Sequence, residues 1–126
     1  MIKTAMLSLI VLLLLVPFFV FSHVSAKAKL SEDQALKVLL SSIEEDGLYG
    51  SNPDMSCFSV FAEERSKDYY DFSVHKNRGG RCSGDPNRSP TVDRFRVDRS
   101  TKTIQWYDEK DRLRTVKAFK KANTKD

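Results

Sequence analysis

The chain has 126 residues, 40% of them hydrophobic and 30% charged, with a formal net charge of +4. Beyond an apolar N-terminus, roughly one hundred residues remain. That length suits one small domain and excludes a Rossmann fold, a barrel enzyme or a kinase. The positive excess is also small for a phosphate footprint, so a nucleic-acid partner is not expected.

Residues 1–26 have the composition of an export signal. They contain 19 hydrophobic residues and a single charged residue, Lys3. A positive start, an apolar stretch and small residues at Val24-Ser25-Ala26 match the three regions of a signal peptide. We therefore predict a signal peptide cleaved after Ala26 and a periplasmic or secreted domain over residues 27–126. The alternative is an uncleaved N-terminal anchor, through which alone the protein would contact a membrane.

The two cysteines of the chain, Cys57 and Cys82, both lie in the part predicted to be exported. An even number of cysteines in an oxidising compartment predicts a disulfide. The loop-entropy estimate for this bridge is roughly 3.5 kcal/mol. That is a large share of the stability of a small domain.

A helix is predicted near the start of the domain. Ser31 and Gln34 have the spacing of a capping box, and Gly47 is a natural stop. Between them, apolar residues recur at helical spacing: Leu36, Leu39, Leu40 and Ile43. The pattern predicts a helix over residues 31–46 whose apolar stripe belongs to the core.

Beyond residue 55 the hydrophobic period changes from that of a helix to that of strands. Alternation predicts four strands, over residues 56–64, 69–76, 91–98 and 103–108. Short connections favour an antiparallel meander, and the helix is the available cover for its apolar face. We therefore expect an α+β fold with one N-terminal helix on a four-stranded antiparallel sheet.

The C-terminal segment is ambiguous. Leu113, Val116 and Phe119 fit one side of a short helix and fit a fifth strand equally well. Residues 120–126 are basic and are expected to form a frayed tail.

A long loop over residues 77–90 separates the second and third predicted strands. It contains three glycines and two prolines, and Arg78, Arg81 and Arg88 stand against Asp85 alone. Arginine offers a planar fork suited to carboxylates and phosphates, so the loop predicts a surface for an acidic partner. The alternative is a structural disulfide loop with solvated arginines.

Three side chains with rings are further candidates for a functional role. Tyr69 and Tyr107 fall on the strand face opposite the predicted core, and with the loop arginines they would suit a protein interface. His75, the one histidine beyond residue 26, also faces away from the core. With Asp71 or Asp85 it provides the basis for a small hydrolase. Zinc spacing, a P-loop and a dinucleotide fingerprint are absent from the sequence, so no metal or cofactor is expected.

Four segments resemble small exported proteins of Gram-negative bacteria that have a Cys-x-Gly-Asp-Pro…Pro loop and no settled activity. They are residues 80–86, 89–90, 95–98 and 104–108. The Val97-Asp98…Thr101…Ile104 hairpin also resembles PepSY-type domains, with Lys102 where their turn usually has glycine. This resemblance implies a helix followed by strands, in a PepSY- or cystatin-like layout. It also implies an extracytoplasmic binding or peptidase-inhibiting role.

The function expected from these features is that of an exported, non-enzymatic binding protein. It would act as an inhibitor or immunity-type protein and dock an acidic cleft of another extracytoplasmic protein through residues 77–90. The alternatives are a structural envelope protein whose loop is inert, and a small hydrolase that uses His75.

Overall fold

A computed structural model describes residues 27–124, so the predicted signal peptide and the last two residues lie outside the described part of the chain. Eight elements follow one another: α1 (Glu32–Glu44), the 3-10 turn η2 (Met55–Cys57), β1 (Phe58–Arg65), β2 (Tyr69–Lys76), β3 (Thr91–Asp98), β4 (Ile104–Tyr107), β5 (Leu113–Thr115) and α2 (Val116–Asn123). Within residues 27–124, none of the helices has the length and apolar character needed to cross a bilayer.

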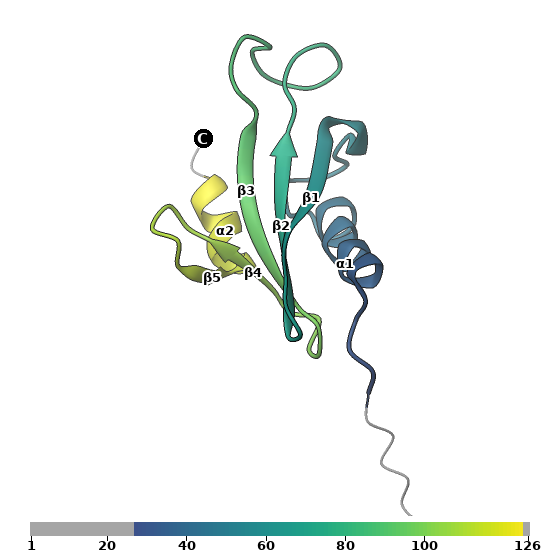
Figure 1. Ribbon diagram of the computed structural model, residues 1–126. Helices are drawn as coiled ribbons and strands as arrows, with labels where there is room; N and C mark the ends of the chain where they lie inside the picture. The colour runs from purple at the N-terminus through teal and green to yellow at the C-terminus, as the bar shows by residue number, and fades with distance from the viewer. Residues whose placement is uncertain (1–26, 125–126) are drawn as a thin grey trace, which may run out of the picture.

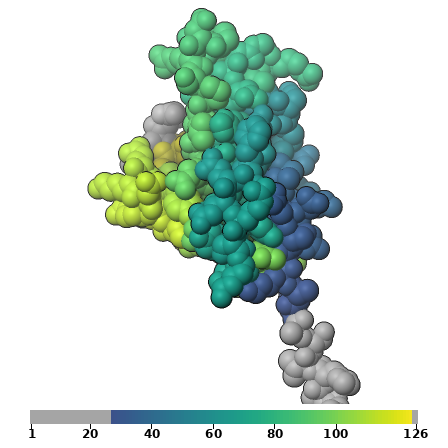
Figure 2. All heavy atoms as spheres, viewed as in Figure 1, coloured from purple at the N-terminus to yellow at the C-terminus, as the bar shows by residue number. Residues whose placement is uncertain are grey.

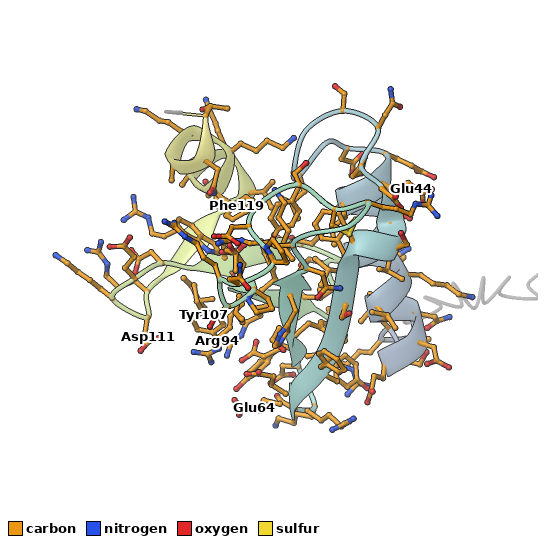
Figure 3. The ribbon with its side chains drawn as sticks, turned by 90° about the horizontal axis from the view of Figure 1, so that it is seen from above. Glu44, Glu64, Arg94, Tyr107, Asp111 and Phe119 are labelled. Carbon is orange, nitrogen blue, oxygen red and sulfur yellow. A yellow bond between two sulfur atoms is a disulfide. The ribbon has the colours of Figure 1, made fainter. Side chains whose placement is uncertain are left out.

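The strands form one antiparallel sheet in the order β1-β2-β3-β4-β5, so each strand pairs with its neighbour in the chain (Figure 1). The predicted α+β fold and antiparallel meander are confirmed. The predicted number of four strands is wrong, because part of the C-terminal segment adds β5. Seen from above, both helices lie on the same side of the sheet (Figure 3). The opposite sheet face is called the outer face below.

Helix α1 begins with the predicted capping box. The Ser31 side chain accepts from the Gln34 amide, and the Gln34 side chain accepts from the Ser31 amide. The helix ends at Glu44, two residues earlier than predicted, and Gly47 continues in a left-handed conformation with φ of 66°. The buried residues of the helix are Ala35, Leu39, Ser42 and Ile43, whereas the predicted Leu36 and Leu40 are half-buried.

The C-terminal segment contains both structures that its pattern allowed. Leu113 pairs with Tyr107 in β5, and the Thr115 hydroxyl then accepts from the Ala118 amide and caps α2. Helix α2 continues through Asn123, so the first part of the predicted frayed tail is helical.

Phe119 anchors helix α2 in the core. It is fully buried, and its ring packs edge-on against Phe95, Trp106 and Tyr49 with centroids 5.2–5.3 Å apart. The other core residues come from α1 and the segments that flank it and from the inner faces of β2 and β3: Leu30, Ala35, Leu39, Ile43, Leu48, Tyr70, Phe72, Val74, Phe95 and Val97.

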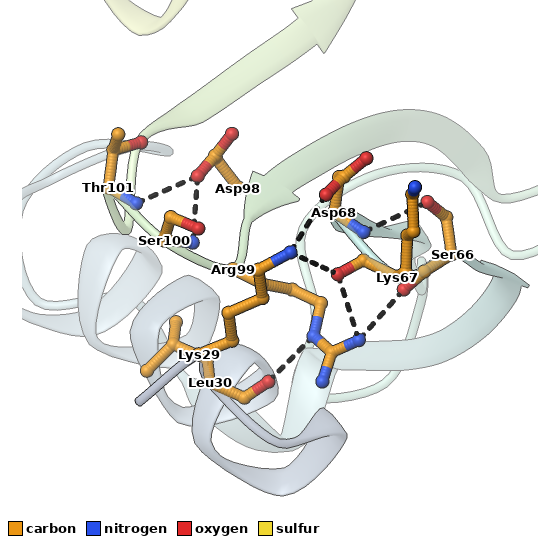
Figure 4. A network of polar contacts seen from close by, with 9 residues as sticks. All are labelled: Lys29, Leu30, Ser66, Lys67, Asp68, Asp98, Arg99, Ser100 and Thr101. Atoms are coloured by element: carbon orange, nitrogen blue, oxygen red, sulfur yellow. Dashed lines mark hydrogen bonds and ion pairs between the residues drawn. The ribbon is translucent and has the colours of Figure 1, made fainter. Parts of the chain in front are cut away.

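Arg99 joins the start of the domain to two turns (Figure 4). Its guanidinium donates to the carbonyl oxygens of Leu30 at 2.8 Å, Ser66 at 3.0 Å and Lys67 at 3.2 Å. Its backbone carbonyl accepts from the Leu30 amide. The described chain therefore enters at one end of the sheet, and residues 77–90 project from the other end (Figures 1 and 2).

Candidate functional site

The predicted disulfide is present and anchors the long loop. Cys57 lies at the end of η2, directly before β1, and is bonded to Cys82 with a Cα–Cα distance of 5.5 Å. Strand β2 ends at Lys76 and β3 begins at Thr91, so the loop spans residues 77–90 as predicted. The bridge thus fixes the middle of this loop to the edge strand of the sheet.

Short-range contacts fold the loop on itself. Gly79 and Cys82 exchange two backbone hydrogen bonds of 3.0 and 2.9 Å. A Cβ atom at Gly79 would lie 2.4 Å from the Pro86 Cβ, so only glycine allows this close approach. The Asp85 carboxylate accepts from the Asn87 amide, and the Asp85 carbonyl accepts from the Arg88 amide. These bonds form the predicted turn around Pro86 and hold the loop in a defined conformation.

The loop arginines lie in three different environments. Arg78 is half-buried, its stem lies against Gly84, and its guanidinium donates to the Thr91 hydroxyl. The Arg81 side chain is 85% exposed and lies 3.6 Å from an Asp54 carboxylate oxygen. Arg88 is exposed at the turn that Asp85 holds. Two of the three arginines are therefore available to a partner.

Tyr69 and Tyr107 lie on the outer face as predicted, in a network that centres on Asp71. Asp71 is 1% exposed and accepts from Arg96 at 2.8 and 3.0 Å and from the Tyr107 hydroxyl at 2.7 Å. The Arg96 guanidinium lies 3.4 Å from the centre of the Tyr69 ring, a cation–π contact. Tyr69 lies at the start of β2, whereas residues 77–90 follow the end of that strand. The structure therefore does not bring the tyrosines of the network together with the loop arginines.

The Asp71 carboxylate raises the pKa values of its two hydrogen-bond donors, Arg96 and Tyr107. The hydrogen bond and charge of Asp71 raise the pKa of Arg96. Burial, followed by the hydrogen bond to Asp71, raises the pKa of Tyr107 to about 12. The Arg94 guanidinium lies 4.5 Å from the centre of the Tyr107 ring and donates to Asp111 (Figure 3). These contacts hold both tyrosines within the protein's own outer face.

His75 has different neighbours from those that the hydrolase alternative requires. Its Nε2 atom lies 3.4 Å from the Ser73 hydroxyl, and its ring packs edge-on against the exposed Phe61. Ser73 is 1% exposed, so its hydroxyl is shielded from a substrate. The carboxylate of Asp71 is occupied by Arg96 and Tyr107, and Asp85 holds the loop turn. His75 forms no hydrogen bond with either aspartate among the described residues.

A cleft at the base of the loop was missed by sequence reasoning. It has a volume of about 460 Å³, and the polar side chains that line it include those of Tyr49, Lys76, Arg78, Asp93, Lys120 and Asn123. These residues come from the segment after α1, from the end of β2, from the loop, from β3 and from α2. No local pattern joins positions so far apart in the chain.

The cleft contains one carboxylate among three cationic side chains. The Asp93 carboxylate accepts from the Tyr49 hydroxyl at 2.6 Å. Burial raises the pKa of Asp93, because the charged form loses hydration. Burial and the charge of Asp93 also raise the pKa of Tyr49. The neutral tyrosine therefore remains a donor to Asp93 and adds no negative charge to the cleft.

A smaller cavity of about 210 Å³ adjoins the cleft, and both are lined by Tyr49 and Lys76. The disulfide and the side chains of Asp54 and Arg81 complete its walls. The two cavities follow the base of the tethered loop. Across residues 27–124, no group of three or more His, Cys, Asp or Glu side chains is placed to hold a metal ion.

Comparisons with protein-family models, with curated proteins and with solved structures found no match for this chain. The candidate site is therefore defined by its geometry: a tethered loop with exposed Arg81 and Arg88, and a cationic cleft at its base.

Proposed function

We propose that this protein is an exported, non-enzymatic binding protein that docks an acidic surface of another extracytoplasmic protein through residues 77–90. It would act as an inhibitor or an immunity-type protein. The observation that carries the proposal is the preordered loop, which projects beyond the sheet with Arg81 and Arg88 exposed (Figure 2).

The loop's order favours binding. A loop that is already held by a disulfide, a backbone bridge and an aspartate turn loses little conformational entropy when it docks. Arginine forks at its surface can form charge-assisted bonds with carboxylates of the partner. The PepSY-like helix-then-strands layout expected from the Val97–Ile104 hairpin, with its peptidase-inhibiting role, agrees with this proposal.

A capture experiment tests the proposal with a charge-matched control. The tagged full-length protein, exported by its own N-terminal segment, is used to capture proteins from the extracytoplasmic extract of its source. Arg81→Ala/Arg88→Ala removes two exposed charges of the loop, and Lys110→Ala/Lys117→Ala removes two exposed charges elsewhere. We expect the wild type and the lysine variant to retain an acidic protein that the arginine variant loses.

Mass spectrometry of the captured proteins, repeated at increasing salt, provides the measurement. Contacts between exposed charges weaken as salt shortens the screening length to about 8 Å at physiological ionic strength. A partner that both double variants retain equally would exclude the loop as the docking surface.

A further inference from the structure

The cleft at the base of the loop gathers more positive than negative side chains. Lys76, Arg78 and Lys120 converge on a space of about 460 Å³, within the range of small-molecule and peptide sites. Lys76 and Arg78 lie at the junction of β2 and the loop, and Lys120 comes from α2. Like charges repel one another when they are brought together, so an arrangement of this kind favours an anion between them.

The protein itself supplies little to neutralise these three charges. Arg78 donates to a neutral hydroxyl, and the Lys120 ammonium donates to the Asp46 carbonyl at 2.7 Å. Within residues 27–124, the Lys76 ammonium forms no hydrogen bond or close ion pair, and the carboxylate on which its charge acts is Asp93. Asp93 is the one carboxylate that lines the cleft, and it accepts a hydrogen bond from the Tyr49 hydroxyl, so one negative charge stands against three positive ones. The cleft is thus cationic overall.

We propose that this cleft binds a carboxylate of an extended acidic peptide segment, which Lys76, Arg78 and Lys120 contact directly. The inference rests on the proposed function, since the segment would belong to the partner that the loop docks. It adds the chemical group recognised and the residues that recognise it.

The shape of the site favours a peptide over a free anion. The neighbouring cavity of about 210 Å³ continues from the cleft past Lys76 and Tyr49 toward Arg81. A small inorganic anion would fill a fraction of the larger cavity alone. An extended chain would occupy both cavities, with one acidic side chain near Lys76 and Lys120 and a second near Arg81. This arrangement also links the cleft to the exposed loop.

Direct binding to the full-length protein tests the assignment at neutral pH and low salt. The probe is pentaglutamate with an acetylated N-terminus and an amidated C-terminus. Pentaglutamine with the same ends and inorganic phosphate are the comparison probes. Titration followed by NMR is expected to show saturable binding of pentaglutamate, much weaker binding of pentaglutamine, and weaker binding of phosphate than of pentaglutamate.

Two variants should weaken binding and one should strengthen it. Lys76→Met and Lys120→Met each remove a charge-assisted bond and should weaken pentaglutamate binding about tenfold. Lys117→Met, on the same helix and exposed, should leave it unchanged. Asp93→Asn keeps an acceptor for Tyr49 and removes the competing charge, so it should tighten binding about threefold. Misfolding cannot produce that gain.

Several results would overturn the assignment. The first is absence of pentaglutamate binding to the wild type. The second is pentaglutamate binding by the Lys76→Met and Lys120→Met variants that is as tight as binding by the wild type. The third is phosphate binding to the wild type that is as tight as pentaglutamate binding. Capture experiments separate this inference from the proposed function. If Arg81→Ala/Arg88→Ala loses the partner and Lys76→Met/Lys120→Met retains it, the loop docks the partner and the cleft assignment is wrong. If the arginine variant retains the partner while the lysine variants lose pentaglutamate, the docking role of the loop is wrong and the cleft assignment stands.

Discussion

The Asp71–Arg96 pair shows how one residue can depart from the pattern of its strand. Asp71 alternates with Tyr70 and Phe72 and so points to the outer face, where a carboxylate would ordinarily meet water. It is nevertheless 1% exposed. Arg96 is its direct partner on β3, and Tyr107 donates to it from β4. Long side chains on adjacent strands have covered the carboxylate and satisfied it.

Breaking this pair should be costly. Arg96→Met leaves a buried carboxylate with the Tyr107 hydroxyl as its remaining side-chain donor, and should lower the free energy of unfolding by about 3 kcal/mol. Tyr107→Phe removes one hydrogen bond and leaves the ion pair, so it should cost about 1 kcal/mol. Urea unfolding at pH 7 measures both values. A cost for Arg96→Met no larger than that for Tyr107→Phe would contradict a buried ion pair at this position.

At the scale of elements, helix α2 completes the cover of the sheet. The inner face of β4 carries Trp106, whereas α1 contacts the central strand β3. Helix α2 is short, and its single fully buried residue is Phe119. Its docking therefore depends mainly on one aromatic side chain, which packs against Phe95, Trp106 and Tyr49.

Phe119→Ala should therefore destabilise the whole domain. Truncation of a fully buried phenylalanine removes its burial and leaves a cavity, at a cost of about 3–5 kcal/mol. The matched control is Phe61→Ala, because Phe61 is 55% exposed on the outer face and its truncation should cost about 0.5 kcal/mol or less. Thermal and urea unfolding of both variants make the comparison. Similar losses for the two would indicate that α2 is not docked as described.

For the whole molecule, the main feature is that the entry of the chain and the long loop lie at opposite ends of the sheet (Figure 1). Arg99 and Lys29 fix the entering chain to the β1–β2 and β3–β4 turns at one end of the sheet. The tethered loop and the cationic cleft lie at the other end (Figure 1). The described chain therefore begins at the end of the domain that lies opposite the proposed docking surface. A partner could approach the loop without crossing the entry point of the chain.

The disulfide links stability to that docking end. Cys57→Ala/Cys82→Ala should lower the free energy of unfolding by roughly 3.5 kcal/mol, because the unfolded chain regains its loop entropy. A reductant should shift the urea midpoint of the wild type toward that of the variant and leave the variant unchanged. If the wild-type midpoint does not respond to full reduction, confirmed by thiol titration, the bridge has no share in stability.

Much of the fold could be predicted because it depends on local order. The capping box and the 3.6-residue period locate α1, and the period of two locates β2 and β3 to the residue. The strand number was wrong because three-residue β5 is too short to show a period, and its last residue, Thr115, already caps the helix that begins at Val116. Two elements within eleven residues leave a pattern that fits either one.

In the candidate site, too, some features follow from local sequence patterns and others depend on tertiary contacts. The sequence by itself determined the bridge between Cys57 and Cys82 and the loop that contains Arg81 and Arg88, since cysteine number and turn residues are visible locally. Only the tertiary structure decided that Lys76 and Lys120 share one cleft, although 44 positions separate them. It also decided that Tyr69 joins Arg96 rather than the loop. Such contacts arise from strand register and helix docking, and register assigns neighbours across the sheet without leaving any periodic trace along the chain.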